Sequence, residues 1–206
     1  MEQNQTKIET QHFKFFWQKY GNAISSIILV VLLIMVGWQY WQRREVKLTT
    51  QASAVYESLL VSYANKNDPQ TQALANQIID DYSRTPYATM AAFLLAKQAV
   101  EQNQLTVAID KLQWVVKHTN DPSFKAVAQI RWARVLLADQ KITQALDVAN
   151  AVDAKEFLAE ADAIKGDSYV ALKQFPQAKA AYQQALAIMP KESALYSYVE
   201  MKLNNV

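Results

Sequence analysis

The sequence contains no cysteine and only three glycines, at positions 21, 37 and 166. The lack of cysteine excludes a disulfide framework and any zinc site built on thiolates. The scarcity of glycine excludes the glycine-rich loops that bind phosphate groups in nucleotide-binding proteins. These absences remove cysteine redox chemistry, thiolate metal sites and phosphate-binding loops from the functions to be considered.

Histidine is also scarce, since His12 and His118 are the only two in the sequence. They are far apart in the sequence, and neither is accompanied by a Ser/His/Asp arrangement or by a spacing typical of metal ligands. The acidic doublet Asp80-Asp81 points to different faces of a helix, which is typical of surface charge. We therefore predict no enzyme activity, no catalytic residue, no metal and no cofactor.

An excess of one charge is also lacking in most of the chain. The net charge is +2, but residues 1–47 carry six basic and three acidic residues, whereas residues 48–206 carry fifteen basic and sixteen acidic ones. A domain without a basic stripe is a poor match for the phosphate backbone of nucleic acid. We therefore predict no nucleic-acid partner.

What the sequence does contain is an apolar run of 22 residues near its beginning, Tyr20–Trp41. A helix of this length spans the hydrocarbon core of a bilayer, which is about 30 Å thick. Aromatic residues flank the run at both of the expected headgroup levels. The residues that follow the run are bulky and then basic, whereas a signal-peptide cleavage site has small residues. We predict a signal-anchor in membrane lipid over residues 20–41, preceded by a tail of residues 1–19. A buried core helix is the alternative.

The basic residues around this run leave its orientation open. Three stand on each side, namely Lys7, Lys14 and Lys19 before it, and Arg43, Arg44 and Lys47 after it. Orientation follows an excess of Lys and Arg on the cytoplasmic side, but a long domain can cross the membrane regardless of flanking charge. Charge alone therefore does not decide on which side the rest of the chain lies.

The remainder, residues 42–206, is predicted to be one all-α domain. Ala, Leu, Gln and Lys are abundant, and apolar residues recur three and four positions apart. Proline fits the first turn of a helix at Pro69 and Pro122, and the residues just before them, Asp68 and Asp121, are expected to cap those helices. Further turn signals are Arg84-Thr85-Pro86 and Pro190.

A repeat of about 34 residues is clearest at 159–192 and resembles a tetratricopeptide repeat. Its characteristic small, aromatic and proline positions are Gly166, Tyr169, Phe175, Ala178, Tyr182, Ala185 and Pro190. Weaker copies place Ala145, Ala108 and Ala73 in the position of Ala178, and Ala133 and Ala96 in that of Gly166. The predicted fold is a tetratricopeptide-like helical-repeat solenoid with a capping helix at Glu192–Leu203, and an irregular helical bundle is the alternative.

This resemblance implies a concave groove lined by the first helix of each pair. The protein-binding positions that it implies are Met90, Phe93, Lys97, Val100, Val127, Ile130, Arg134 and Leu137, with Ala163, Asp167 and Val170 in the final repeat. Such a surface is mostly apolar, which suits an extended or partly unfolded apolar chain or an amphipathic partner helix. The alternative is that Phe93, Ile130 and Leu137 simply pack against neighbouring helices.

Three segments resemble the YfgM family of ancillary SecYEG translocon subunits. They are Gly37-Trp38-Gln39-Tyr40-Trp41, Arg131-Trp132-Ala133-Arg134-Val135 and Met201-Lys202-Leu203-Asn204-Asn205. The resemblance implies a single-pass protein of the bacterial inner membrane, with residues 1–19 cytoplasmic and residues 42–206 periplasmic. It also implies association with SecYEG and the chaperone PpiD, and a role in passing unfolded secreted polypeptides to periplasmic chaperones. A structural scaffold or stress-regulatory interaction protein that binds no client is the alternative function.

Overall fold

The computed structural model describes the backbone of residues 2–206 and the side chains of Ser26 and residues 29–206. It divides into two compact units, Met1–Leu48 and Thr49–Val206, and helix α1 (Glu2–Ala64) runs through both. In the first unit the backbone of residues 2–48 is helical. Side chains 20–25, 27 and 28 of the expected membrane span lie outside the described residues. Among the residues that are described, no helix is long and apolar enough to cross a membrane.

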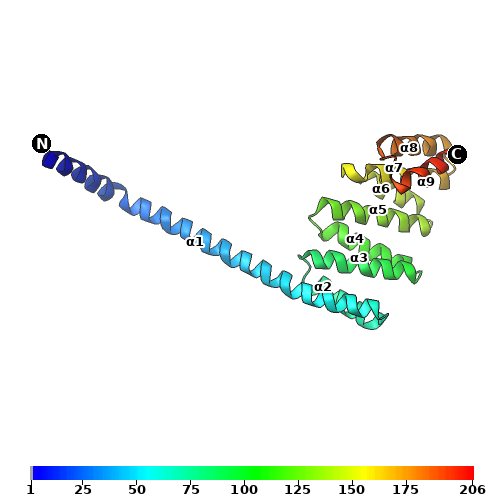
Figure 1. Cartoon of the computed structure of the whole chain (residues 1–206), viewed down its shortest axis with the longest axis horizontal. Helices are drawn as coiled ribbons and strands as arrows, with labels where there is room; N and C mark the ends of the chain where they lie inside the picture. The colour runs from blue at the N-terminus through cyan, green and yellow to red at the C-terminus, as the bar shows by residue number, and fades with distance from the viewer. Residues whose placement is uncertain (1) are drawn as a thin grey trace. The chain divides into compact units, whose positions relative to one another are not determined.

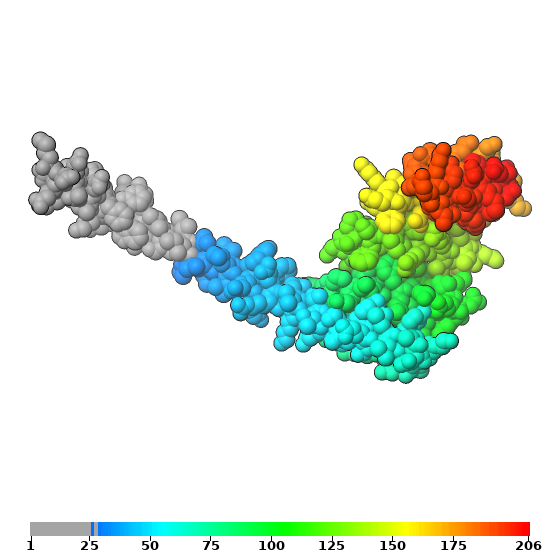
Figure 2. Space-filling model, viewed as in Figure 1, coloured from blue at the N-terminus to red at the C-terminus, as the bar shows by residue number. Residues whose placement is uncertain are grey.

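The second unit is built from short helices, as the three- and four-residue periodicity predicts. After α1 come α2 (Asp68–Asp81), α3 (Pro86–Glu101), α4 (Leu105–His118), α5 (Pro122–Ala138), α6 (Ile142–Asn150), the 3₁₀ helix η1 (Lys155–Phe157), α7 (Leu158–Ala171), α8 (Phe175–Ile188) and α9 (Ala194–Asn204). Within this unit the helices stack in the order of the sequence (Figure 1). The space-filling view shows the same succession (Figure 2). This ordered stacking is an all-helical solenoid. The alternative, an irregular helical bundle, is therefore not the fold.

The helices pair through a turn that recurs throughout the described chain. One residue in each turn has a left-handed backbone: Lys66, Asn103, Gln140 and Lys173, with φ of 55–60°, which are 37, 37 and 33 residues apart. The amide after each one donates to a carbonyl five residues earlier, as in Gln104 to Ala99 at 2.7 Å and Lys141 to Leu136 at 2.9 Å. These bonds define a Schellman motif, which satisfies carbonyls that a helix end leaves unpaired.

Helices α2 and α5 both begin with a polar capping residue and a proline in the first turn, as the sequence predicts. The carboxylate of Asp121 accepts hydrogen bonds from the amides of Ser123 at 2.8 Å and Phe124 at 3.1 Å, so its predicted role is confirmed. The predicted cap at Asp68 is wrong, because Asn67 occupies the capping position and Asp68 is the first residue of α2. The carboxylate of Asp68 instead accepts hydrogen bonds from the side chains of Gln98 and Gln102 on α3.

The repeat register is confirmed in the later pairs and corrected in the first. Ala108, Ala145 and Ala178 are each the fourth residue of a second helix and are fully buried. The predicted counterpart Ala73 is exposed, and the fourth residue of α2 is the buried Thr71. The Thr71 hydroxyl donates to the Ser62 hydroxyl at 3.1 Å, so the first pair holds its helices together with a polar contact at this level.

The last pair and its cap close the solenoid at the carboxyl end. The expected capping helix is α9, which begins after Ser193, whose hydroxyl accepts from the amide of Leu195 at 3.3 Å. Val199 of α9 is buried in the same cluster as Ala178 and Tyr182. Without α9, this apolar surface of the final pair would be open to solvent, and its burial favours the folded state.

Candidate protein-binding groove

The first helices of the second and third pairs, α3 and α5, carry the eight predicted binding residues. Spacings of three and four residues put Phe93, Lys97 and Val100 on one face of α3. The structure places these three side chains around one hollow, which we call the Phe93 hollow and whose volume is about 450 Å³. It is lined by Phe93, Ala96, Lys97, Val100 and Glu101 of α3, Leu112 of α4, and Arg131, Arg134 and Val135 of α5.

Phe93 forms an apolar wall of this hollow and remains half-buried. It packs against buried residues on both sides and lies beside Phe124, with the two ring centroids 6.3 Å apart. Val100 is 44% exposed at the other end of the same face. The hollow therefore presents apolar surface that the helices of this chain leave uncovered.

The remaining predicted residues are distributed differently. Ile130 is only 3% exposed and belongs to the core between α4, α5 and α6. Met90 is exposed but does not line the Phe93 hollow, and Val127 is half-buried. Leu137 is half-buried against the core and lines a second hollow further along the solenoid. The Phe93 hollow thus brings together Phe93, Lys97, Val100 and Arg134, whereas the other four residues do not line it.

Charged side chains form the rim of the Phe93 hollow. The ammonium group of Lys97 lies 3.6 Å from the Glu101 carboxylate and donates to the Tyr63 hydroxyl at 3.1 Å. The hydrogen bond with Tyr63, together with the negative potential of Glu101, raises the pKa of Lys97. Lys97 is therefore a cation at neutral pH, and its charge is largely balanced by its neighbour.

The third helix pair supplies two further cations to this rim. The Arg134 guanidinium pairs with Glu160 of α7 at 3.1 Å. The guanidinium of Arg131 lies over the Phe93 ring, with its central carbon 4.8 Å from the ring centroid. Arg131 was missed as a site residue in the sequence, although it lies four positions after Val127 and three before Arg134, on the same line of α5.

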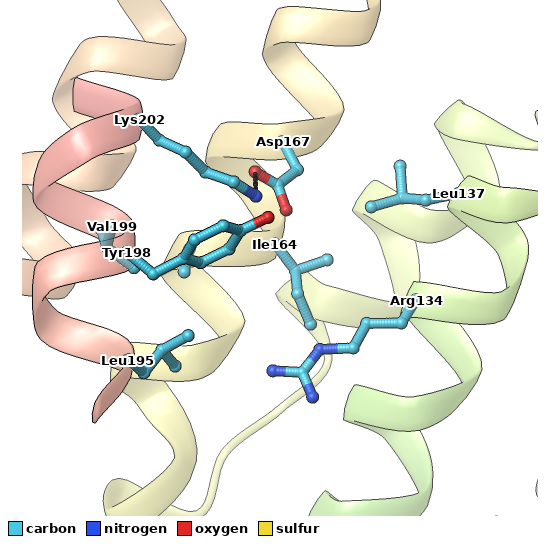
Figure 3. Close-up of a pocket in the computed structure, with 9 residues that line it drawn as sticks. Arg134, Leu137, Ile164, Asp167, Leu195, Tyr198, Val199 and Lys202 are labelled. Carbon is cyan, nitrogen blue, oxygen red and sulfur yellow. Dashed lines mark hydrogen bonds and ion pairs between the residues drawn. The ribbon is translucent and has the colours of Figure 1, made fainter. Parts of the chain in front are cut away.

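The second hollow, of about 430 Å³, lies between α5, α7 and α9, and we call it the α9 hollow. Figure 3 shows Arg134 reaching into it from α5, opposite Leu195 and Tyr198 of α9. The lining also includes Ala163 and Asp167, which are two of the three positions predicted for the final repeat. The third, Val170, is half-buried against the last core cluster.

Asp167 connects the last helices through its carboxylate. It accepts hydrogen bonds from the Tyr182 hydroxyl at 2.7 Å and from the Lys202 ammonium at 2.6 Å. Burial, followed by the hydrogen bond to Asp167, raises the pKa of Tyr182. Tyr182 is therefore neutral at physiological pH and remains a donor to Asp167, so these groups hold α7, α8 and α9 together.

Outside the groove, His118 contacts a residue of its own helix. His118 stacks on Trp114 with ring centroids 4.4 Å apart, and its Nδ1 lies 2.8 Å from the Trp114 carbonyl oxygen. Trp114 and Trp132 are partly buried against the core clusters. Across the described part of the chain, no three His, Cys, Asp or Glu side chains are grouped so that they could hold a metal ion.

The layered helix pairs and the groove along their first helices define an α-solenoid of the tetratricopeptide type. A family model described as a tetratricopeptide repeat-like domain matches residues 14–206, so the chain belongs to this family.

Similar proteins confirm the resemblance found in the sequence. The chain is 29% identical to the ancillary SecYEG translocon subunit of Aggregatibacter actinomycetemcomitans over 200 residues, which cover 96% of each protein. It is 27% identical to the protein of the same name from Neisseria gonorrhoeae and 24% identical to that from Escherichia coli K12. Each of these two matches covers 96% of this chain and 95% of the relative.

Proposed function

We propose that this protein is a membrane-anchored adaptor that associates with the SecYEG translocon through protein–protein contacts and is not an enzyme. In this proposal residues 20–41 anchor the chain in the inner membrane, residues 1–19 are cytoplasmic and residues 42–206 form the periplasmic repeat domain. The similarity to proteins named ancillary SecYEG translocon subunits along almost the whole chain supports the association.

The observation that carries a binding role is the Phe93 hollow. Its apolar surface is flanked by exposed charged side chains and lies on the first helices of two adjacent pairs. Burial of apolar surface drives association, while charged groups at the edge select the partner. We propose that this hollow holds a segment of a partner, either PpiD or a secreted polypeptide that is being passed to periplasmic chaperones.

A scaffold that binds no client is the second candidate function, and the α9 hollow favours it. Two of its charged groups, Arg134 and Asp167, are already paired with Glu160 and Lys202. The side chains of α9 also form one wall of this hollow. In that half of the groove the protein's own groups therefore occupy positions at which a partner would have to compete.

Replacement of Phe93 and Val100 by serine in the full-length chain tests the two functions. If the hollow binds partners, the double variant loses most of its co-purification with SecYEG, PpiD or arrested secreted chains, because a few well-packed residues carry most of an interface's free energy and these two supply apolar surface to the hollow. The matched control is Ile188→Ser on α8, which removes an exposed apolar side chain outside the groove. Co-purification of the folded double variant at parental levels would favour the scaffold.

A further inference from the structure

The charges around the Phe93 hollow are not balanced. Its lining carries three cations, Lys97, Arg131 and Arg134, and one anion, Glu101. Lys97 is paired with Glu101, and Arg134 with Glu160. For Arg131, the described part of the chain offers no carboxylate within 4.0 Å. The hollow therefore combines an uncovered apolar surface with one cation that has no anionic partner.

The position of Arg131 suits recognition of a carboxylate. Its guanidinium carbon lies over the Phe93 ring, 4.8 Å from the centroid, and this cation–π contact holds the group beside the hollow. The planar guanidinium carries its N–H donors at its edge, where they match the two oxygens of a carboxylate. Because the side chain is exposed, a carboxylate from outside can reach its N–H donors.

We propose that the Phe93 hollow recognises a protein segment in which a large apolar side chain is followed at once by an acidic one. The apolar side chain fills the hollow between α3 and α5, and the carboxylate pairs with Arg131 at its rim. A hollow of about 450 Å³ has room for one or two such apolar side chains. This inference rests on the proposed binding role of the hollow and specifies the chemistry of its partner.

Two labelled peptides test the charge preference on the unmodified full-length chain in non-ionic detergent. The probes are fluorescein-Gly-Ser-Leu-Leu-Glu-Glu-Ser-Gly and the same peptide with both glutamates replaced by glutamine, and fluorescence anisotropy gives the dissociation constants. We expect the glutamate peptide to bind about two- to fivefold more tightly at low salt, since an ion pair at an exposed rim contributes on this scale. We expect the preference to shrink at high salt.

Variants then assign the preference to one residue. Arg131→Gln should bring the ratio of the two dissociation constants close to one, whatever its effect on the affinity for the glutamine peptide. Arg84→Gln, at an exposed arginine in the turn between α2 and α3, is the matched control and should keep the parental ratio. Arg131→Lys should recover only part of the preference, because an ammonium group neither stacks flat on the ring nor forms a two-point contact.

The outcomes separate this inference from the proposed function. Equal binding of both peptides by the parent, lost in Phe93→Ser, would overturn the acidic preference and leave the hollow as a binding surface. Binding of neither peptide would overturn the inference, whereas co-purification with the translocon would still test the broader function. If dihexanoylphosphatidylglycerol bound in an Arg131-dependent way and neither peptide did, the rim would be a lipid site and the proposal would be wrong.

Discussion

At the scale of one residue, Gly166 shows how closely two helices approach each other in the last repeat pair. It is buried in α7 beneath the ring of Tyr182, and a Cβ atom built on it would lie 2.5 Å from Cδ1 and 2.8 Å from Cζ of that ring. Tyr182 is itself only 1% exposed, so the ring cannot move away into solvent. Glycine is therefore needed here for close approach between helices, and not for backbone freedom.

Gly166→Ala is expected to destabilise the repeat domain by about 1–2 kcal/mol. Overpacking against the buried ring outweighs the gain in helix propensity that alanine brings. The matched control is Gly37→Ala in α1, where an added Cβ would have no neighbour within 4 Å. Chemical denaturation of the two variants measures the difference. A Gly166→Ala variant as stable as the control would contradict this packing.

Tyr182→Phe is expected to change how stability depends on pH. The folded state raises the pKa of Tyr182 above its ordinary value of 10.0, so above that pH the unfolded chain releases a proton that the folded chain retains. Stability is therefore fully present below about pH 10 and decreases as the pH rises further. Tyr182→Phe should lose about 1 kcal/mol at neutral pH with its hydrogen bond to Asp167, and should decline less steeply at alkaline pH. Equal alkaline slopes in urea titrations would contradict the raised pKa.

At the scale of elements, the turn within each helix pair places a residue other than glycine in a left-handed backbone conformation. For a residue with a Cβ atom, this conformation costs about 1–2 kcal/mol relative to the right-handed helical one. Glycine does not pay this cost, because it has no Cβ to clash. The Schellman hydrogen bonds and the packing of the two helices hold Lys66, Asn103, Gln140 and Lys173 in place nonetheless.

Gln140→Gly is therefore expected to stabilise the domain by about 0.5–1 kcal/mol, after allowance for the greater freedom of glycine in the unfolded chain. The matched control is Ala138→Gly, two residues earlier, at the exposed last residue of α5. Because that position is helical, glycine there should destabilise by about 1 kcal/mol. Thermal unfolding of both variants gives the two signs, and the same sign for both would contradict the turn geometry.

These elements also show how far the sequence predicts the fold. Proline and Asp121 mark the start of α5, and small residues such as Ala145 and Ala178 mark the second helices, so these features were predicted. The turns within later pairs were not predicted individually, because Asn103 and Gln140 carry neither a proline nor a glycine signal.

The groove could be predicted only in part, for a physical reason that concerns α5. This helix packs against α3, α4, α6 and α7, so most of its circumference is buried, including Ile130. After its first two residues, Pro122 and Ser123, the exposed side chains left on it are Arg131, Arg134 and Ala138. A repeat pattern transferred from the sequence does not specify how wide the buried face of a central helix is, and therefore missed Arg131.

At the scale of the whole molecule, helix α1 belongs to both units, since it contains residues 2–48 and also supplies the first helix of the first repeat pair. Leu59 of α1 is fully buried with Ile78 of α2 in the core of the second unit. Helix α1 therefore supplies residues both to the proposed anchor and to the core of the repeat domain.

Protease added to intact spheroplasts should digest residues 42–206 and spare a tag placed at the N-terminus. The expectation follows from the proposed orientation, in which the repeat domain lies outside the cytoplasm. Immunoblots against tags at the two ends measure it, and a cytoplasmic marker protein controls for leakage. Protection of the repeat domain until the inner membrane is lysed would reverse the orientation.

The stacking order has a consequence for how the chain reaches its structure during synthesis. Within the described residues, each helix of the second unit makes its main contacts with helices one or two elements away. A fold of such local contacts forms rapidly, because no contact waits for a distant part of the chain. As the polypeptide emerges from its amino end, each new helix pair meets a neighbour that is already folded. Only the last pair, which α9 covers, must wait for the final residues before its apolar surface is protected.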